Sequence, residues 1–164
     1  MTTPAPIAAV FDCSVFAQAL INPRGPAAAC LTAAQEGRVR LFVSEYVLGE
    51  VRELADKLPP RVRPSPERVD RLVGELARYA HAVVDVPAQF QYPRDPDDAH
   101  YVDLALAAGA TYVVSRDRDL LDLGDPALDA SREVARRFPD LKFVDPVAFL
   151  RLIPSEWDEL KNEP

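Results

Sequence analysis

The strongest constraint on the fold is a set of short apolar runs, each about as long as one β-strand, that alternate with segments of helical character. The runs are Ile7–Phe11, Val39–Val43, Ala82–Val86, Thr111–Ser115 and Leu141–Val144. A short, continuous apolar run favours a buried strand. Strands that alternate with helices favour a parallel sheet with helices packed on its faces. We therefore expect an α/β fold: a three-layer sandwich with a mostly parallel central sheet of about five strands.

Segments with helical character lie between the runs. Ala27–Glu36 is rich in alanine and stops at Gly37, and Ser44 is a candidate N-cap for a helix that runs to about Leu58. Further helices are expected over Glu67–Ala80, Asp97–Ala108, Ala127–Phe138 and Pro146–Ile153. The chain of 164 residues shows no repeat, and its length suits one domain. We expect a single domain over residues 1–164, with its core at about residues 7–153.

The formal net charge is −7 at pH 7. Taken alone, this charge argues against a nucleic-acid partner, because phosphate binding favours a basic surface. An acidic balance also arises when carboxylates gather to bind a metal ion, or when acids simply keep a protein soluble. The charge therefore leaves the partner open.

The compartment is predicted from what the sequence lacks. Cys13 and Cys30 are too few for a disulfide framework, and no apolar run reaches the length of a membrane span. No basic region precedes the first apolar run, so we expect no signal peptide. A reducing cytoplasm, with no membrane contact, is the simplest expectation.

Two aspartates follow predicted strands directly. Asp12 ends the first apolar run, and Asp117 comes just after the fourth. In open parallel sheets the ligand site lies at the carboxyl ends of the strands, where both residues are expected. An aspartate after a strand is also a common loop or N-cap residue, so either one alone leaves its role open.

A glutamate and a further aspartate lie on predicted helices. Glu50 flanks an apolar helix face and therefore needs a partner, a metal ion or a path to solvent; Arg52 is one candidate partner. Asp98 shares a closely packed face with Val102 and Ala105. For Asp95 and Asp97, capping and the helix dipole are a sufficient explanation. Asp103 lies about 140° around the helix from Asp98, so the two should not share a site.

Several carboxylates near strand ends suggest a site for a hard cation. Oxygen ligands suit Mg²⁺ or Mn²⁺, and the sequence has no Cys/His set with zinc spacing. Such an ion can orient and acidify a water molecule and offset the charge of a phosphate. Arg116, next to the proposed site, could steer RNA phosphates toward it.

Four segments, taken in order, resemble the four motifs of PIN domains. They are residues 7–16 (IAAVFDCSVF), 44–54 (SEYVLGEVREL), 95–110 (DPDDAHYVDLALAAGA) and 111–121 (TYVVSRDRDLL). The resemblance runs from about Ile7 to Phe149. Its acidic residues fall on Asp12, Glu50, Asp98 and Asp117, which become the expected catalytic residues. The metal is expected on Asp12, Asp98 and Asp117, with Ser14, Asp119 and Arg116 as accessory residues.

The resemblance implies a Mg²⁺- or Mn²⁺-dependent endoribonuclease that cleaves single-stranded RNA. The pattern is similar to that of the toxins of bacterial toxin–antitoxin pairs. VapC-type members of that group are dimers held inactive by an antitoxin protein, so the resemblance also implies a homodimer and an antitoxin partner.

One departure from the PIN pattern keeps alternatives open. The first aspartate is usually followed by Thr-Asn, whereas this chain has Cys13 and Ser14. A non-catalytic PIN-like module that binds protein or RNA is one alternative. A haloacid-dehalogenase-like phosphohydrolase is another, but that class needs a second aspartate where Ser14 stands.

Overall fold

A computed structural model describes residues 3–154. Within them a sheet of five strands has the order β3-β2-β1-β4-β5, and every neighbouring pair is parallel. The strands are β1 (Ile7–Phe11), β2 (Val39–Val43), β3 (His81–Ala82), β4 (Tyr112–Val114) and β5 (Lys142–Val144). The sheet confirms the predicted α/β fold class, and it is parallel throughout.

The central strand is β1, which pairs with β2 on one side and β4 on the other. Val10 lies opposite Phe42 of β2 and Val113 of β4. Ala9, Val10 and Phe11 are completely buried, as expected of a strand covered on both faces. Because β1 is central, the residue that follows it stands in the middle of the sheet's carboxyl edge.

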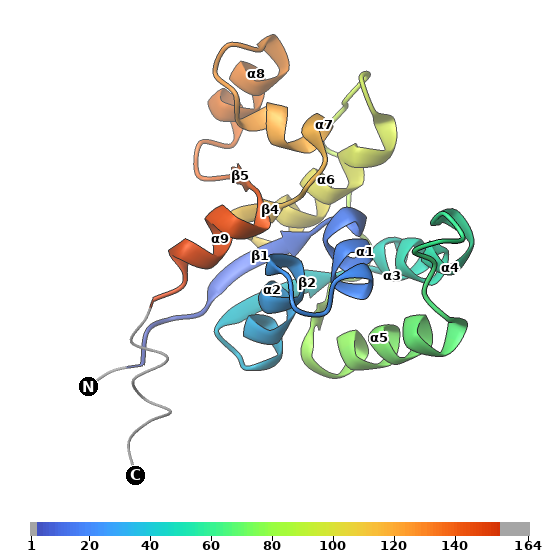
Figure 1. Cartoon of the computed structure of the whole chain (residues 1–164). Helices are drawn as coiled ribbons and strands as arrows, with labels where there is room; N and C mark the ends of the chain where they lie inside the picture. The colour runs from blue at the N-terminus through green and yellow to red at the C-terminus, as the bar shows by residue number, and fades with distance from the viewer. Residues whose placement is uncertain (1–2, 155–164) are drawn as a thin grey trace.

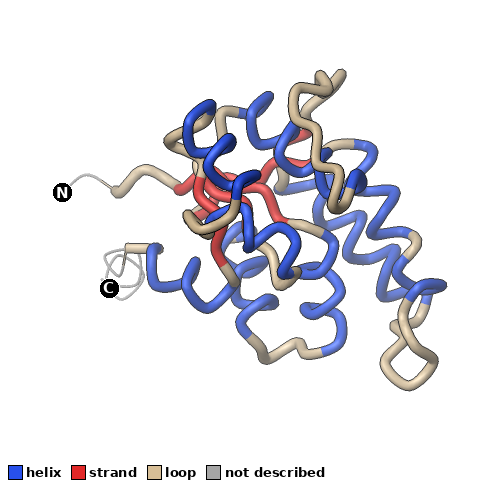
Figure 2. The backbone as a smooth tube through the Cα atoms, turned by 90° about the horizontal axis from the view of Figure 1, so that it is seen from above, coloured by secondary structure: helices blue, strands red, loops and turns tan. Residues whose placement is uncertain are grey.

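Helices cover both faces of the sheet. In Figure 1, α1, α2 and α9 lie in front of β1 while α6 lies behind it, and Figure 2 shows the strands enclosed by helices. The helices are α1 (Cys13–Ile21), α2 (Pro26–Gln35), α3 (Glu45–Arg52), α4 (Leu54–Lys57), α5 (Pro66–Tyr79), α6 (Ala99–Ala108), α7 (Arg118–Leu121), α8 (Asp129–Arg137) and α9 (Pro146–Leu152), with the 3₁₀ turns η1 (Pro96–Asp98) and η2 (Asp122–Gly124). Among these described helices, none has both the length and the apolar character needed to cross a membrane.

Several strands pass into a helix through a single capping residue. Asp12 caps α1 by accepting a hydrogen bond from the backbone N–H of Val15, and Ser44 caps α3 by accepting one from Val47. After β4, Ser115 and Arg116 come first, and Asp117 then caps α7 through the N–H of Asp119. The capping role of these residues fixes their side chains at the carboxyl edge of the sheet.

Some predicted boundaries were wrong. The third strand is His81–Ala82 rather than Ala82–Val86: its pairing ends where its partner β2 ends, at Val43, and the chain beyond includes Asp85 with a positive φ of 56°. The helix from Ser44 is divided at Glu53 into α3 and α4. The short helix α7 after Asp117 was not predicted, since Arg118–Leu121 is only four residues long.

Candidate metal centre

Four aspartates gather where β4 and the segment before α6 meet. Asp95, Asp98, Asp117 and Asp119 each offer a carboxylate oxygen, and these oxygens all lie within 4.8 Å of one another. Asp95 caps η1, Asp98 ends it, Asp117 caps α7 and Asp119 lies in the first turn of α7. We refer to these four residues as the acidic group. The first turns of η1 and α7 therefore place four carboxyl groups in one small volume.

Asp98 is the member of the acidic group whose negative charge is least favourable. Its side chain is 7% exposed, and its Oδ2 is the one buried side-chain oxygen or nitrogen without a hydrogen-bond partner in residues 3–154. Burial raises the pKa of Asp98 from 3.8 to about 8, and the charges of Asp95, Asp117, Asp12 and Asp119 raise it as well. A buried carboxylate in this state gains from a cation.

Asp12 adjoins the acidic group but is held differently. It is 3% exposed, and burial raises its pKa to about 6 although three hydrogen bonds oppose the shift. Its Oδ1 accepts hydrogen bonds from the hydroxyl of Ser14 and from the N–H of Val15, and its Oδ2 accepts one from the hydroxyl of Ser115 at 2.6 Å. These donors orient the carboxylate rigidly at the end of β1.

The serines connect Asp12 to the loop after β4. The hydroxyl of Ser115 accepts a hydrogen bond from the N–H of Asp117 at 2.8 Å, and the hydroxyl of Ser14 accepts one from the N–H of Arg116 at 2.9 Å. The ends of β1 and β4 are thus joined by two hydroxyl bridges. Asp12 and Asp117 therefore keep a fixed mutual position.

Glu50 lies apart from the acidic group. It is half-buried on α3, where its charge helps to raise the pKa of the nearby Tyr46 hydroxyl. The thiol of Cys13 donates to the backbone carbonyl of Glu50 at 3.7 Å. Arg52, the partner considered from the sequence, pairs with Glu45 instead, at 3.7 Å. The structure thus places Glu50 beside Cys13, on the α3 side of the site.

The surroundings of Cys13 favour the neutral thiol over the nucleophilic thiolate. Burial, with the nearby charges of Glu50 and Asp12, raises its pKa to about 12. Its backbone N–H donates to the hydroxyl of Tyr101 at 3.2 Å. Because the thiolate is the reactive form, this environment disfavours chemistry at Cys13.

Arg94 borders the acidic group on its outer side. Its Nε lies 2.7 Å from Oδ1 of Asp119, and another guanidinium nitrogen lies 2.9 Å from Oδ2 of Asp122. The preceding loop is anchored by Phe90 and Tyr92, which are both buried, and the Tyr92 hydroxyl donates to the carbonyl of Asp119. These two rings cover the core beneath the loop.

Sequence reasoning missed two residues of this region. Asp95 was explained by capping alone, yet it both caps η1 and belongs to the acidic group. The available signal was its spacing of three residues from Asp98, which puts both on one side of a helical turn. Ser115 was treated only as the end of a strand, although its hydroxyl connects Asp12 to Asp117.

Asp103 lies outside the acidic group, as the helix geometry predicted. It is 6% exposed, and its Oδ1 accepts hydrogen bonds from the N–H groups of Gln89 and Phe90 at 2.9 and 2.8 Å. Through these hydrogen bonds its carboxylate fixes the loop before α6. Asp103 is therefore a structural residue.

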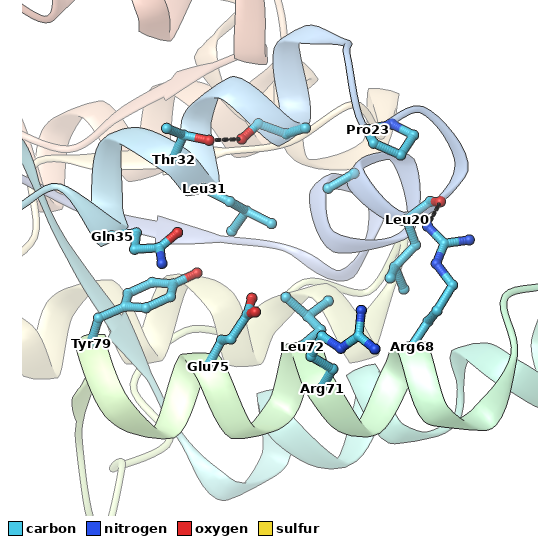
Figure 3. A pocket seen from close by; sticks show the side chains of 12 residues that line it. Leu20, Pro23, Leu31, Thr32, Gln35, Arg68, Arg71, Leu72, Glu75 and Tyr79 are labelled. Carbon is cyan, nitrogen blue, oxygen red and sulfur yellow. Dashed lines mark hydrogen bonds between the residues drawn. The ribbon is translucent and has the colours of Figure 1, made fainter.

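A separate groove lies between the α1–α2 pair and α5, away from the acidic group. Figure 3 shows Leu20, Leu31 and Leu72 along it, with Arg68 and Arg71 at one end and Tyr79 at the other. Arg68 donates to the carbonyl of Leu20 at 2.6 Å and so ties α5 to α1. We assign this groove a role in packing these helices.

The acidic group fits a hard divalent cation. All its ligand atoms are carboxylate oxygens, which Mg²⁺ and Mn²⁺ prefer, and the unpartnered Oδ2 of Asp98 is an atom that a cation would satisfy. The fold and this group together define a broad class: α/β proteins with an acidic site at the carboxyl edge of a parallel sheet.

Comparison with known proteins identifies the family within this class. The PIN domain family model matches residues 8–119, about two thirds of the chain. The chain therefore belongs to the PIN domain family, and PIN domains are generally nucleases. It is also similar to the uncharacterized protein MJ1680 of Methanocaldococcus jannaschii, at 27% identity over 121 residues, covering 73% of this chain and 76% of that protein.

Proposed function

We propose that the protein is a Mg²⁺- or Mn²⁺-dependent endoribonuclease that hydrolyses phosphodiester bonds of single-stranded RNA. The observation that carries the proposal is the buried, unpartnered Oδ2 of Asp98 within the acidic group. A buried oxygen of a purely structural aspartate is expected to accept hydrogen bonds, as Oδ1 of Asp103 does from two backbone N–H groups. The PIN family assignment supplies the nuclease chemistry.

Each expected residue has a part in this proposal. Asp98 and Asp117 hold the cation, with Asp95 and Asp119 beside them, and Asp12 contributes from the end of β1. Ser14 and Ser115 orient Asp12, while Arg116 stands at the rim for RNA phosphates. Glu50 lies on the α3 side of the site and has an orienting role there. When bound, the cation supplies positive charge to attract a phosphodiester and to acidify a water molecule.

The direct test is cleavage of a single-stranded RNA with Mg²⁺, with Mn²⁺ and with a chelator. The proposal expects cleavage with either ion, none in the chelator, and none with Asp12→Asn. Undiminished cleavage in the chelator would contradict metal dependence. The absence of cleavage under every condition, with RNA binding retained, would favour the non-catalytic module instead.

The phosphohydrolase alternative has less support. A haloacid-dehalogenase-like enzyme would use Asp12 as a nucleophile, yet Asp12 is buried and accepts hydrogen bonds on both oxygens. Release of phosphate from a phosphomonoester in place of RNA cleavage would reverse this preference.

We further propose that the protein is the toxin of a toxin–antitoxin pair, forms a homodimer and acts in the cytoplasm as one domain over residues 1–164. The sequence motifs support the toxin role through their resemblance to VapC-type proteins, and free Cys13 and Cys30 suit a reducing compartment. Growth arrest on induced expression, relieved by Asp98→Asn, would support toxicity. Sedimentation as a strict monomer would contradict the dimer.

A further inference from the structure

A second hollow lies at the same edge of the sheet as the acidic group, where β2 and β3 end. Its volume is about 340 Å³, and its apolar wall includes Val43, Leu48, Val83 and Val84. Tyr46, His100, Glu45 and Asp85 also belong to its lining. Val84 is 79% exposed, so its side chain is open to contact with a ligand.

An exposed aromatic ring forms one side of this hollow. Tyr46 on α3 is 40% exposed, and its ring centroid lies 4.2 Å from that of His100 on α6, with 37° between the ring planes. His100 is fixed from behind, because its Nε2 lies 2.7 Å from the hydroxyl of Ser44. The Tyr46 ring therefore rests on a rigid support and presents its other face outward.

The hollow lies near the proposed catalytic site. Burial raises the pKa of the Tyr46 hydroxyl, and the nearby charges of Glu50, Asp97 and Asp98 raise it as well. A chain of RNA with one phosphate at the acidic group could thus place a neighbouring nucleotide over Tyr46.

The charged residues that line the hollow favour binding of the base of a nucleotide over binding of its phosphate. Its charged lining residues are Glu45 and Asp85, which would repel a phosphate. An unpaired nucleobase is neutral, flat and able to stack on an aromatic ring. The apolar wall and the exposed ring suit such a ligand.

We propose that this hollow is a nucleobase-binding site, in which one unpaired base of the RNA stacks on Tyr46 and packs against Val84. The inference rests on the proposed function, since it takes RNA as the ligand. It makes Tyr46 a residue that positions the RNA beside the acidic group.

The test measures RNA binding without cleavage. An Asp98→Asn background without metal is used throughout, and fluorescence anisotropy follows a labelled single-stranded oligoribonucleotide. Tyr46→Ala should weaken binding roughly 5- to 150-fold, the range expected for one lost stacking contact. Tyr46→Phe, which keeps the ring, should remain within about twofold on the same reasoning.

An oligonucleotide with one abasic position, moved along the strand, separates stacking from a general loss of affinity. At one position the abasic RNA should bind weakly, and Tyr46→Ala should then cause no further loss. Val84→Asp, which changes a side chain that is 79% exposed, should also weaken binding. Leu152→Ala is the control, because Leu152 is 41% exposed but lies near Tyr112 and Lys142, at the other end of the strands.

Equal affinity of Tyr46→Ala and its parent, or an equal loss on every abasic RNA, would overturn the base site. These outcomes are independent of cleavage. RNA stacking on Tyr46 in a protein that never cleaves RNA would contradict the proposed function alone, and cleavage unaffected by Tyr46→Ala would contradict the base site alone.

Discussion

Two buried aspartates at opposite ends of a short stretch of chain, Asp98 and Asp103, show how differently a carboxylate can be used. Both side chains are less than one tenth exposed. Asp103 accepts two backbone N–H hydrogen bonds from the loop before η1, whereas Asp98 has an oxygen without a partner and other aspartates around it. The two side chains are similarly buried, but Asp103 lies next to hydrogen-bond donors whereas Asp98 lies next to other acids.

Burial alone therefore does not identify a functional acid. The carboxylate of Asp103 is satisfied by the fold and stabilises it. The carboxylate of Asp98 costs the fold free energy, and that cost is explained if a cation binds there. The pair therefore provides matched substitutions: one should affect function, and the other should affect stability.

The largest expected effect is on cleavage by the Asp98→Asn variant. Loss of one ligand of the acidic group should reduce the rate on the order of 100- to 1,000-fold or more. Asp103→Asn should cleave RNA at nearly the rate of the wild type, because its carbonyl oxygen still accepts hydrogen bonds from Gln89 and Phe90. Rates measured with saturating Mn²⁺ would decide this. Similar activity in the two variants would remove the contrast between the two residues.

A large loss of stability is expected for Asp103→Ala. The N–H groups of Gln89 and Phe90 would lose their acceptor, at a cost of about 2–4 kcal/mol. The Tm should fall by roughly 5–15 °C for a chain of this length. Thermal unfolding in the chelator measures the change. A Tm equal to that of the wild type would mean that the loop does not depend on Asp103.

The opposite change is expected for Asp98→Asn without metal. Removing a buried, repelled charge should raise the free energy of unfolding by about 1–3 kcal/mol. The folded pKa of Asp98 is raised from 3.8 to about 8, so the wild type loses stability as the pH rises between these values. The advantage of the asparagine should therefore grow from pH 4 to pH 8 and then level off. Denaturant unfolding at several pH values in the chelator tests this, and a destabilised asparagine variant would contradict it.

The smallest effect is expected at Arg94. Its guanidinium pairs with Asp119 of the acidic group and with the neighbouring Asp122. Arg94→Ala should tighten Mn²⁺ binding by about two- to fivefold and leave the Tm nearly unchanged, since the pairs are partly exposed. Arg132→Ala, which removes an exposed ion pair with Asp129 on α8, is the matched control and should leave Mn²⁺ affinity unchanged. Weaker Mn²⁺ binding by Arg94→Ala would show that Arg94 supports the site.

The sequence predicted the fold class because its strands are short apolar runs with clear ends, as at Ile7–Phe11. It placed Asp12 and Asp117 at the carboxyl edge for the same reason, since Asp12 follows β1 directly and Asp117 comes shortly after β4. The third strand was harder. Its apolar run continues to Val86, but the pairing stops at Ala82, opposite the last residue of β2, and no sequence pattern signalled that register.

Which acids share a site depends on side-chain directions that a motif does not contain. The structure brings Asp95 and Asp119 beside Asp98 and Asp117, while Glu50 stands apart next to Cys13. The helix period correctly separated Asp103 from Asp98, because that argument needs only a rotation per residue. The bridges through Ser14 and Ser115 depend on the packing of β4 against β1, which the sequence does not specify.

The central claim is that the acidic group binds a divalent cation through Asp98. The most direct test is a calorimetric titration of Mn²⁺ into the wild type, Asp98→Asn and Asp103→Asn, each first freed of metal. We expect Asp98→Asn to bind Mn²⁺ at least about 10- to 100-fold more weakly than the wild type, and Asp103→Asn to bind it with wild-type affinity. Equal Mn²⁺ affinity in the wild type and Asp98→Asn would contradict the claim.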